Sequence, residues 1–225
     1  MIQMQWTEVI STWLKEGDDS AENLLDYPWD VTINQLEGGI EREVIVASHP
    51  KIPFNIEVVV SKHFTNLVIN PLIPTDALDA EERMRLYKKL LHLNSDLNLM
   101  KAGLVGYDDQ PVIQVDLDLG AISKTEFNDA LTLLILGTQN LIILLGLEEK
   151  IQEFMFQRFK QMVALKLASG EKEEEIIDFL TSRGGLEIEV AKEIFNQVMK
   201  LVDENGKNTE EEAPQVSDYD GPMYG

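Results

Sequence analysis

The stretch VIQVDLDLGAISKTEFNDA, residues 112–130, contains the clearest evidence about the fold of this chain. Its first half alternates apolar with polar side chains, which is the pattern of a strand with one buried face. Ser123 and Glu126 have the spacing of a capping box, so we expect a helix to begin there. The uncharged residues 130–147 extend this helix. The chain is therefore expected to contain a half-buried strand followed directly by a long helix.

The residues before this stretch predict two amphipathic helices and further short strands. Apolar side chains recur every three or four residues at about 3–15 and 79–97, which indicates helices packed on one side. Runs separated by glycine and proline predict strands at 29–33, 43–47, 54–60, 65–70, 99–107 and 112–119. Residues 108–111 are expected to form a hairpin loop. Short strands joined by short connections favour antiparallel pairing, so we predict an α+β fold, an antiparallel sheet with flanking helices.

The pattern of apolar residues changes after residue 147. Residues 148–203 show only helical spacing, which predicts a helical C-terminal extension. Residues 204–225 lose this periodicity and are rich in acidic side chains, so we expect an acidic disordered tail. The sequence thus predicts an α+β domain at 1–147, followed by the extension and the tail.

Three segments of the predicted domain resemble a known superfamily. They are LYKKLLHLN at 86–94, the hairpin at 99–119 and SKTEFNDAL at 123–131. With the order of elements around them, residues 1–147 resemble the type III secretion chaperone-like superfamily, which also includes bacterial sensory-transduction regulators. The resemblance implies a secretion chaperone-like fold, a protein-binding role, frequent homodimers and no catalytic motif. Secretion chaperones of this type usually end with the long helix, and the helices predicted at 148–203 depart from that pattern.

The composition excludes some chemistry and argues against some partners. The 225 residues include no cysteine, which excludes disulfides, thiolate catalysis and cysteine-bound zinc. The net charge of −21 repels nucleic acid and anionic membranes, and it favours basic or apolar-plus-basic protein partners. An acidic surface can equally serve only to keep the protein in solution. The N-terminus shows no secretory signal, so we expect a cytoplasmic protein.

One stretch of the chain is long enough to be tested as a membrane span. Residues 130–147 carry no charge, and their length is at the threshold for a spanning helix. Thr132, Gln139 and Asn140 interrupt the apolar run, and no cluster of lysine or arginine flanks it. We therefore expect a helix buried by protein and no membrane span.

No catalytic or metal-binding motif is visible in the sequence. Hydrolase, phosphate-binding and dinucleotide-binding glycine motifs are absent, so we predict no catalytic residues, no cofactor and no enzyme. The histidines lack the spacing of a metal site: His49, His63 and His92. The densest carboxylate group is Asp108, Asp109, Asp116 and Asp118. These oxygens can suit Mg²⁺ or Ca²⁺, but the solvated face of an antiparallel sheet explains them better.

Apolar residues on the predicted strands are the candidate binding residues. If they face away from the core, they offer a surface to an extended partner: Val44, Val46, Val59 and Val68. The alternative is that the long C-terminal helix covers this face. In the tail, Tyr219 and Tyr224 are candidate docking residues, because aromatic side chains in acidic disordered segments can bind partners; the alternative is a passive tail.

These observations favour a non-catalytic chaperone-like or adaptor protein, a homodimer that binds a partner polypeptide. A first alternative is a regulatory protein whose sheet and helices enclose a small-molecule ligand. A second alternative is a divalent-metal enzyme that uses the carboxylates between Asp108 and Asp118.

Overall fold

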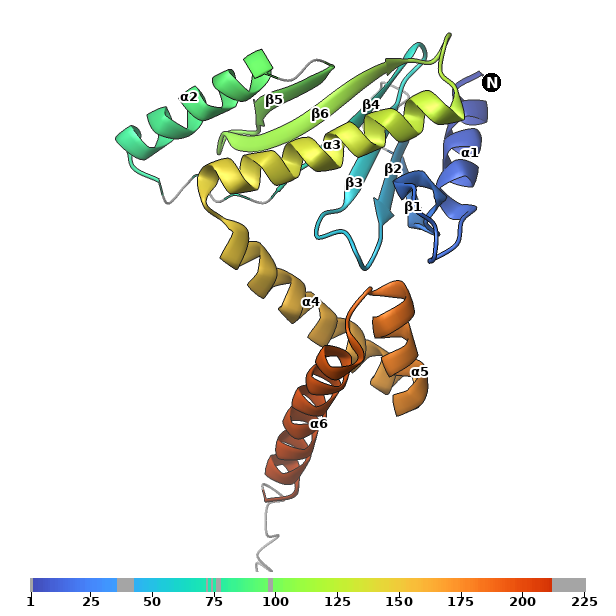
Figure 1. Ribbon diagram of the computed structural model, residues 1–225, viewed down its shortest axis with the longest axis vertical. Coiled ribbons are helices and arrows are strands. Elements are labelled where there is room, and N and C mark those ends of the chain that lie inside the picture. Colours follow the sequence, from blue (N-terminus) through green and yellow to red (C-terminus); the bar gives the residue numbers. More distant parts are fainter. Residues whose placement is uncertain are drawn as a thin grey trace, which may run out of the picture. The chain divides into compact units, whose positions relative to one another are not determined.

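The computed structural model describes residues 2–35, 43–71, 73, 75, 78–96 and 99–211, of which 2–5, 96 and 203–211 are described by backbone alone (Figure 1). The chain divides into two compact units. The first comprises residues 1–155 and 182–184, and the second comprises residues 156–181 and 185–225.

The first unit is built on a six-stranded antiparallel sheet. Its strands are β1 (Asp30–Gln35), β2 (Glu43–Ser48), β3 (Ile56–Val60), β4 (Phe64–Ile69), β5 (Met100–Val105) and β6 (Gln110–Asp118). Their order across the sheet is β1-β2-β3-β4-β6-β5, and every neighbouring pair is antiparallel. This arrangement, with the flanking helices, confirms the predicted α+β fold class.

Helices cover one face of this sheet, as Figure 1 shows for α3. They are α1 (Ile2–Lys15), the 3₁₀ turn η1 (Leu24–Asp26), α2 (Ala80–Asp96) and α3 (Lys124–Leu145). Across the sheet, Ile45 lies opposite Val58, Val58 opposite Leu67 and Leu67 opposite Val115. These four residues are at most 1% exposed, and they join apolar residues of the helices in a single core. We call this side of the sheet the inner face.

The long helix α3 begins and ends at the signals in its sequence. Ser123 and Glu126 form the predicted capping box, and Gly146 ends the helix with a φ of 66°. By length and composition α3 is able to cross a membrane. Here its buried side chains, including Phe127 and Leu131, belong to the core. A Cβ at Gly137 would overlap the Sδ of Met100, so this glycine lets α3 approach β5 closely.

The hairpin between β5 and β6 turns earlier than the sequence predicts. Its turn is at 106–109, where Gly106 has a φ of 73°. Pro111 therefore lies inside β6, opposite Leu104, and not in the loop. The pairing of β6 with β4 ends at Ile113, so the missing N–H of the proline costs no bond to β4.

The outer edge of β5 is occupied by a side chain from α2. The Asn94 Nδ2 donates to the carbonyl oxygen of Ala102 at 2.9 Å, and the Ala102 N–H donates to Asn94 Oδ1 at 2.6 Å. The amide thus makes the two bonds that a neighbouring strand would make at this position.

The second unit is helical. It contains the end of α4 (Glu148–Ala168), α5 (Glu173–Asp178), the first three residues of the π-helix η2 (Phe179–Arg183) and α6 (Ile188–Glu211). Its buried apolar residues are Phe159, Val163, Ile176, Leu180, Ala191, Ile194, Phe195 and Val198. The helix α6 continues to Glu211, so it extends into the segment expected to be a disordered tail.

Candidate functional site

The four candidate valines lie together on the face of the sheet opposite the core. Val44 lies opposite Val59, while Val46 and Val68 lie on either side of Glu57. Each alternates along its strand with an inner-face residue, so all four point away from the core. We call Val44, Val46, Val59 and Val68 the valine surface.

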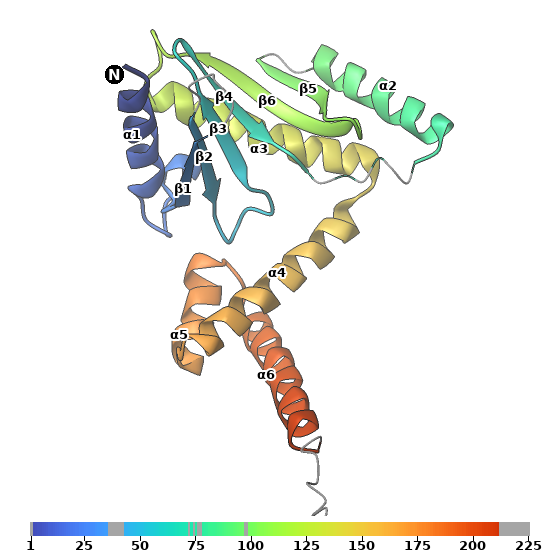
Figure 2. The same ribbon diagram turned by 180° about the vertical axis from the view of Figure 1, so that it is seen from behind.

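Within the described residues of the α+β unit, the helices that join the core pack on the inner face and not on the valine surface. The core that includes residues of α1, α2 and α3 contains none of the four valines. In the view from behind (Figure 2), the strands β3 and β4 lie in front of α3. Val44 is nevertheless only 7% exposed, and the other three are half-buried.

Polar and charged side chains border the valine surface on β4 and β6. Asn66 lies opposite both Val59 and Asp116, and its amide donates to the Asp116 carboxylate. Lys101 forms an ion pair with Asp116 at 2.5 Å. The hydrogen bond from Lys101 lowers the pKa of the Asp116 carboxyl below its usual range, so this group is ionised at neutral pH. Phe64 lies opposite Asp118 and is 57% exposed.

A cavity of about 310 Å³ lies beside the end of β6. Its apolar lining is Leu99, Val115, Leu117, Ala121, Ile122, Ala130 and Leu133, and its charged lining is Asp116, Asp118, Glu126 and Asp129. The sequence prediction missed this cavity, although the alternating aspartates of the strand and the acidic first turns of α3 are visible signals. Residues distant in sequence meet here only because α3 crosses the sheet.

The structure does not bring the four candidate aspartates together. Asp108 and Asp109 lie in the hairpin turn, whereas Asp118 lies at the other end of β6, about 25 Å away for a strand of this length. Asp109 accepts a hydrogen bond from the Tyr87 hydroxyl, which raises the pKa of that phenol. Among the described residues, no group of three or more histidines and carboxylates is placed to hold a metal ion. The second alternative, a metal enzyme, has no support from this geometry.

The three histidines differ in burial. His63 and His92 are exposed, whereas His49 is fully buried and stacks on Tyr27 with ring centres 4.8 Å apart. Its Nδ1 accepts the N–H of Lys51, so Nε2 carries the proton and donates to Asp19 at 3.3 Å. Burial lowers the pKa of His49, and the Asp19 hydrogen bond opposes this only in part. This is a packed structural histidine.

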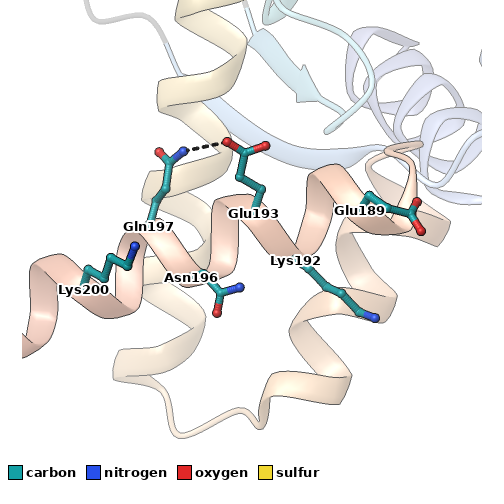
Figure 3. A pocket seen from close by; sticks show the side chains of 6 residues that line it. All are labelled: Glu189, Lys192, Glu193, Asn196, Gln197 and Lys200. Atoms are coloured by element: carbon teal, nitrogen blue, oxygen red, sulfur yellow. Dashed lines mark hydrogen bonds between the residues drawn. The ribbon is translucent and has the colours of Figure 1, made fainter.

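A surface hollow in the second unit lies along α6. Six residues of that helix border it: Glu189, Lys192, Glu193, Asn196, Gln197 and Lys200. Figure 3 shows that they project from a single helix, with Gln197 donating to Glu193. Within the described part of the chain, the hollow has no wall from a second element. Two carboxylates and two ammonium groups also cancel, so this face lacks the positive charge that phosphate binding requires.

Comparison with known families divides the chain at a similar place. A family model described as Domain of unknown function (DUF8183) matches residues 8–145, more than half of the chain. The chain belongs to the DUF8183 family. A second model, HTH_78, also described as a domain of unknown function, matches residues 146–209. No curated protein and no solved structure matches the chain.

The DUF8183 match contains the sheet, the valine surface and the cavity. Neither description mentions secretion chaperones, so that resemblance stays a prediction. Tyr219 and Tyr224 lie outside the described residues and outside both matches.

Proposed function

We propose that this protein binds a partner polypeptide through the valine surface and catalyses no reaction. The observation that carries the proposal is the position of four valines on the face of the sheet opposite the core. A sheet face without covering helices is normally polar, because alternation places hydrophilic residues outward. Apolar side chains at these positions support contact with another chain.

The charges around the valine surface support a partner that is both apolar and basic. Glu57 lies between Val46 and Val68, and Asp116 and Asp118 lie on the same face of β6. The whole chain carries a net charge of −21. An acidic border attracts a basic chain and speeds its association, while apolar contacts supply most of the affinity.

Phage display of random peptides on the full chain tests this proposal. We expect recovered peptides with alternating apolar residues, and we expect binding to fall when Val46, Val59 and Val68 are all changed to threonine. Threonine keeps the shape and strand preference of valine but has a hydroxyl in place of one methyl group, and the three positions are only half-buried, so the variant is expected to fold.

The matched control is Val105→Thr on β5, where the valine is 45% exposed and lies opposite Gln110, away from the valine surface. We expect unchanged binding for Val105→Thr. Failure to recover any peptide, or equal binding by the triple threonine variant, would refute the proposed function. We also propose a cytoplasmic homodimer, and a monomeric mass by light scattering would contradict that part.

A second candidate is the binding of a small-molecule ligand by a regulatory protein, favoured by the 310 Å³ cavity. Native mass spectrometry of the purified protein tests it. A bound small molecule, lost on substitution of a cavity residue, would support this function over polypeptide binding.

A further inference from the structure

The cavity at the end of β6 exists because β5 begins at Met100, opposite Val115, whereas β6 continues to Asp118. The pairing of β5 with β6 runs only from Val105 to Met100, which lies opposite Val115. Beyond Val115, within the described residues, β6 keeps its partner β4 on one side and has no paired residue on the other. The first turns of α3 close the space on the inner side, where Ala130 and Leu133 form part of the wall.

The interior of this cavity is apolar. Val115 and Ala130 are buried, and Leu117, Ile122 and Leu133 are half-buried. Leu99 lies at the mouth and is 75% exposed. Its φ is 69°, a backbone angle that residues other than glycine and asparagine rarely adopt. The volume is at the small end of the range for ligand sites, which suits an aliphatic side chain better than a large cofactor.

The mouth of the cavity is negatively charged. All four charged residues that line it are acidic and exposed: Asp116, Asp118, Glu126 and Asp129. Asp118 accepts the N–H of Gly120, and Glu126 accepts bonds from Ser123, so neutral donors hold these two carboxylates in place. Among the described residues, Asp116 is the one of the four with a cationic partner, Lys101. The charge at the mouth is therefore only partly compensated.

The cavity mouth is continuous with the valine surface. Asp116 lies opposite Asn66, which lies opposite Val59, and Asp118 lies opposite Phe64. A chain lying across the valine surface towards β6 therefore reaches the mouth within one or two strand spacings, about 5 to 10 Å.

We propose that a lysine side chain of the bound polypeptide lies across the mouth of this cavity, with its aliphatic stem against the apolar lining and its ammonium group among the carboxylates. The proposal rests on the proposed function and assigns a partner chemistry to it. A lysine suits the site because its stem covers apolar surface while its charged end stays near water. Arginine binds best to one carboxylate in a planar, paired geometry, whereas here the carboxylates come from two different elements.

A titration with butylamine, a mimic of the lysine side chain, tests the cavity independently of any peptide. We expect the amide NMR signals of Ala121, Ile122 and Leu133 to shift with butylamine in the full chain. Butanol and pentanoate, which have the same four-carbon apolar stem without the positive charge, should shift them much less. Added salt should weaken the butylamine effect, because the carboxylates are exposed. No shift, or equal shifts with butanol, would overturn the proposal.

Peptides recovered by display test whether the lysine comes from the partner. We expect them to contain lysine beside apolar residues, and we expect acetylation of that lysine to weaken binding about tenfold or more. Acetylation keeps the stem and removes the charge. Recovered peptides without lysine, or with no loss on acetylation, would overturn this inference while leaving the proposed function standing. Recovery of no peptide would refute the proposed function itself.

Two variants with matched controls complete the test. Asp118→Asn with Asp129→Asn should weaken lysine-peptide binding about threefold to tenfold. The control is Glu8→Gln on α1 with Glu16→Gln just after that helix, which changes the charge equally and should leave binding nearly unchanged.

Leu99→Asn removes an apolar wall and is expected to fold, because asparagine tolerates a positive φ. Its control is Leu91→Asn on α2, where the leucine is 67% exposed and does not line the cavity. Equal binding by the Leu99 and Leu91 variants would contradict the placement of the lysine stem.

Discussion

Both faces of the sheet carry valines, but the surroundings of these valines differ. In the run Val58-Val59-Val60, the first and last valines are fully buried on the inner face, whereas Val59 points to the other side and is half-buried. The inner face packs against residues from three helices in one core. The comparison teaches that apolar content alone does not identify a core, because the helices decide which face is covered.

The largest expected effect comes from shortening a residue of the inner face. Leu67→Ala removes a fully buried side chain and leaves a cavity, so the free energy of unfolding should fall by about 3 kcal/mol. Val68→Ala, one residue along on the valine surface, should cost about 1 kcal/mol or less, because Val68 is already half-exposed. Urea unfolding of both variants measures the difference. Equal losses would mean that the valine surface is covered as completely as the inner face.

A smaller effect is expected where α3 approaches the inner face most closely. Gly137→Val would force its side chain into the space of Met100, so we expect a loss of about 1 to 3 kcal/mol in the free energy of unfolding. Met100→Ala empties that space, and the double variant should recover part of the loss beyond simple addition. Thermal and urea unfolding of the two single variants and the double variant form the cycle. Strict additivity would contradict the contact.

The smallest effect is expected at His49, beyond the end of β2. Its pKa in the folded protein lies below the ordinary value of 6.5, so the folded state keeps the ring neutral. As the pH falls below about 6.5, the unfolded chain binds a proton that the folded protein does not, and stability falls. Above that pH the histidine contributes no pH dependence. We expect His49→Gln to lose this part of the pH dependence, measured by urea unfolding at pH 5.5 to 7.5, the range around the ordinary pKa.

Local signals in the sequence predicted most of the fold. The capping box at Ser123 and the alternation along β3 and β6 depend on neighbouring residues, and the structure contains them. The sequence predicts the hairpin turn too late, because proline is typical of a loop. Pro111 instead lies in β6, where the pairing with β4 ends at Ile113, and this is a property of the whole sheet.

The candidate site was predictable only in part. Alternation along β2 places Val44 and Val46 on one face of that strand, but it does not say which face of the sheet the helices cover. The cavity was not predictable, because Leu99 and Asp129 meet only through the path of α3. Two residues thirty positions apart leave no joint signal in a single sequence.

The two edge strands of the sheet differ in whether they can pair with another strand. At the β5 end, the Asn94 amide already occupies the N–H and carbonyl of Ala102, while β1 is the other edge strand. If two copies of the chain paired through their β1 strands, the edge strand left on each copy would be β5, where Asn94 already bonds Ala102. Such growth would close at a pair and could not propagate into a fibre.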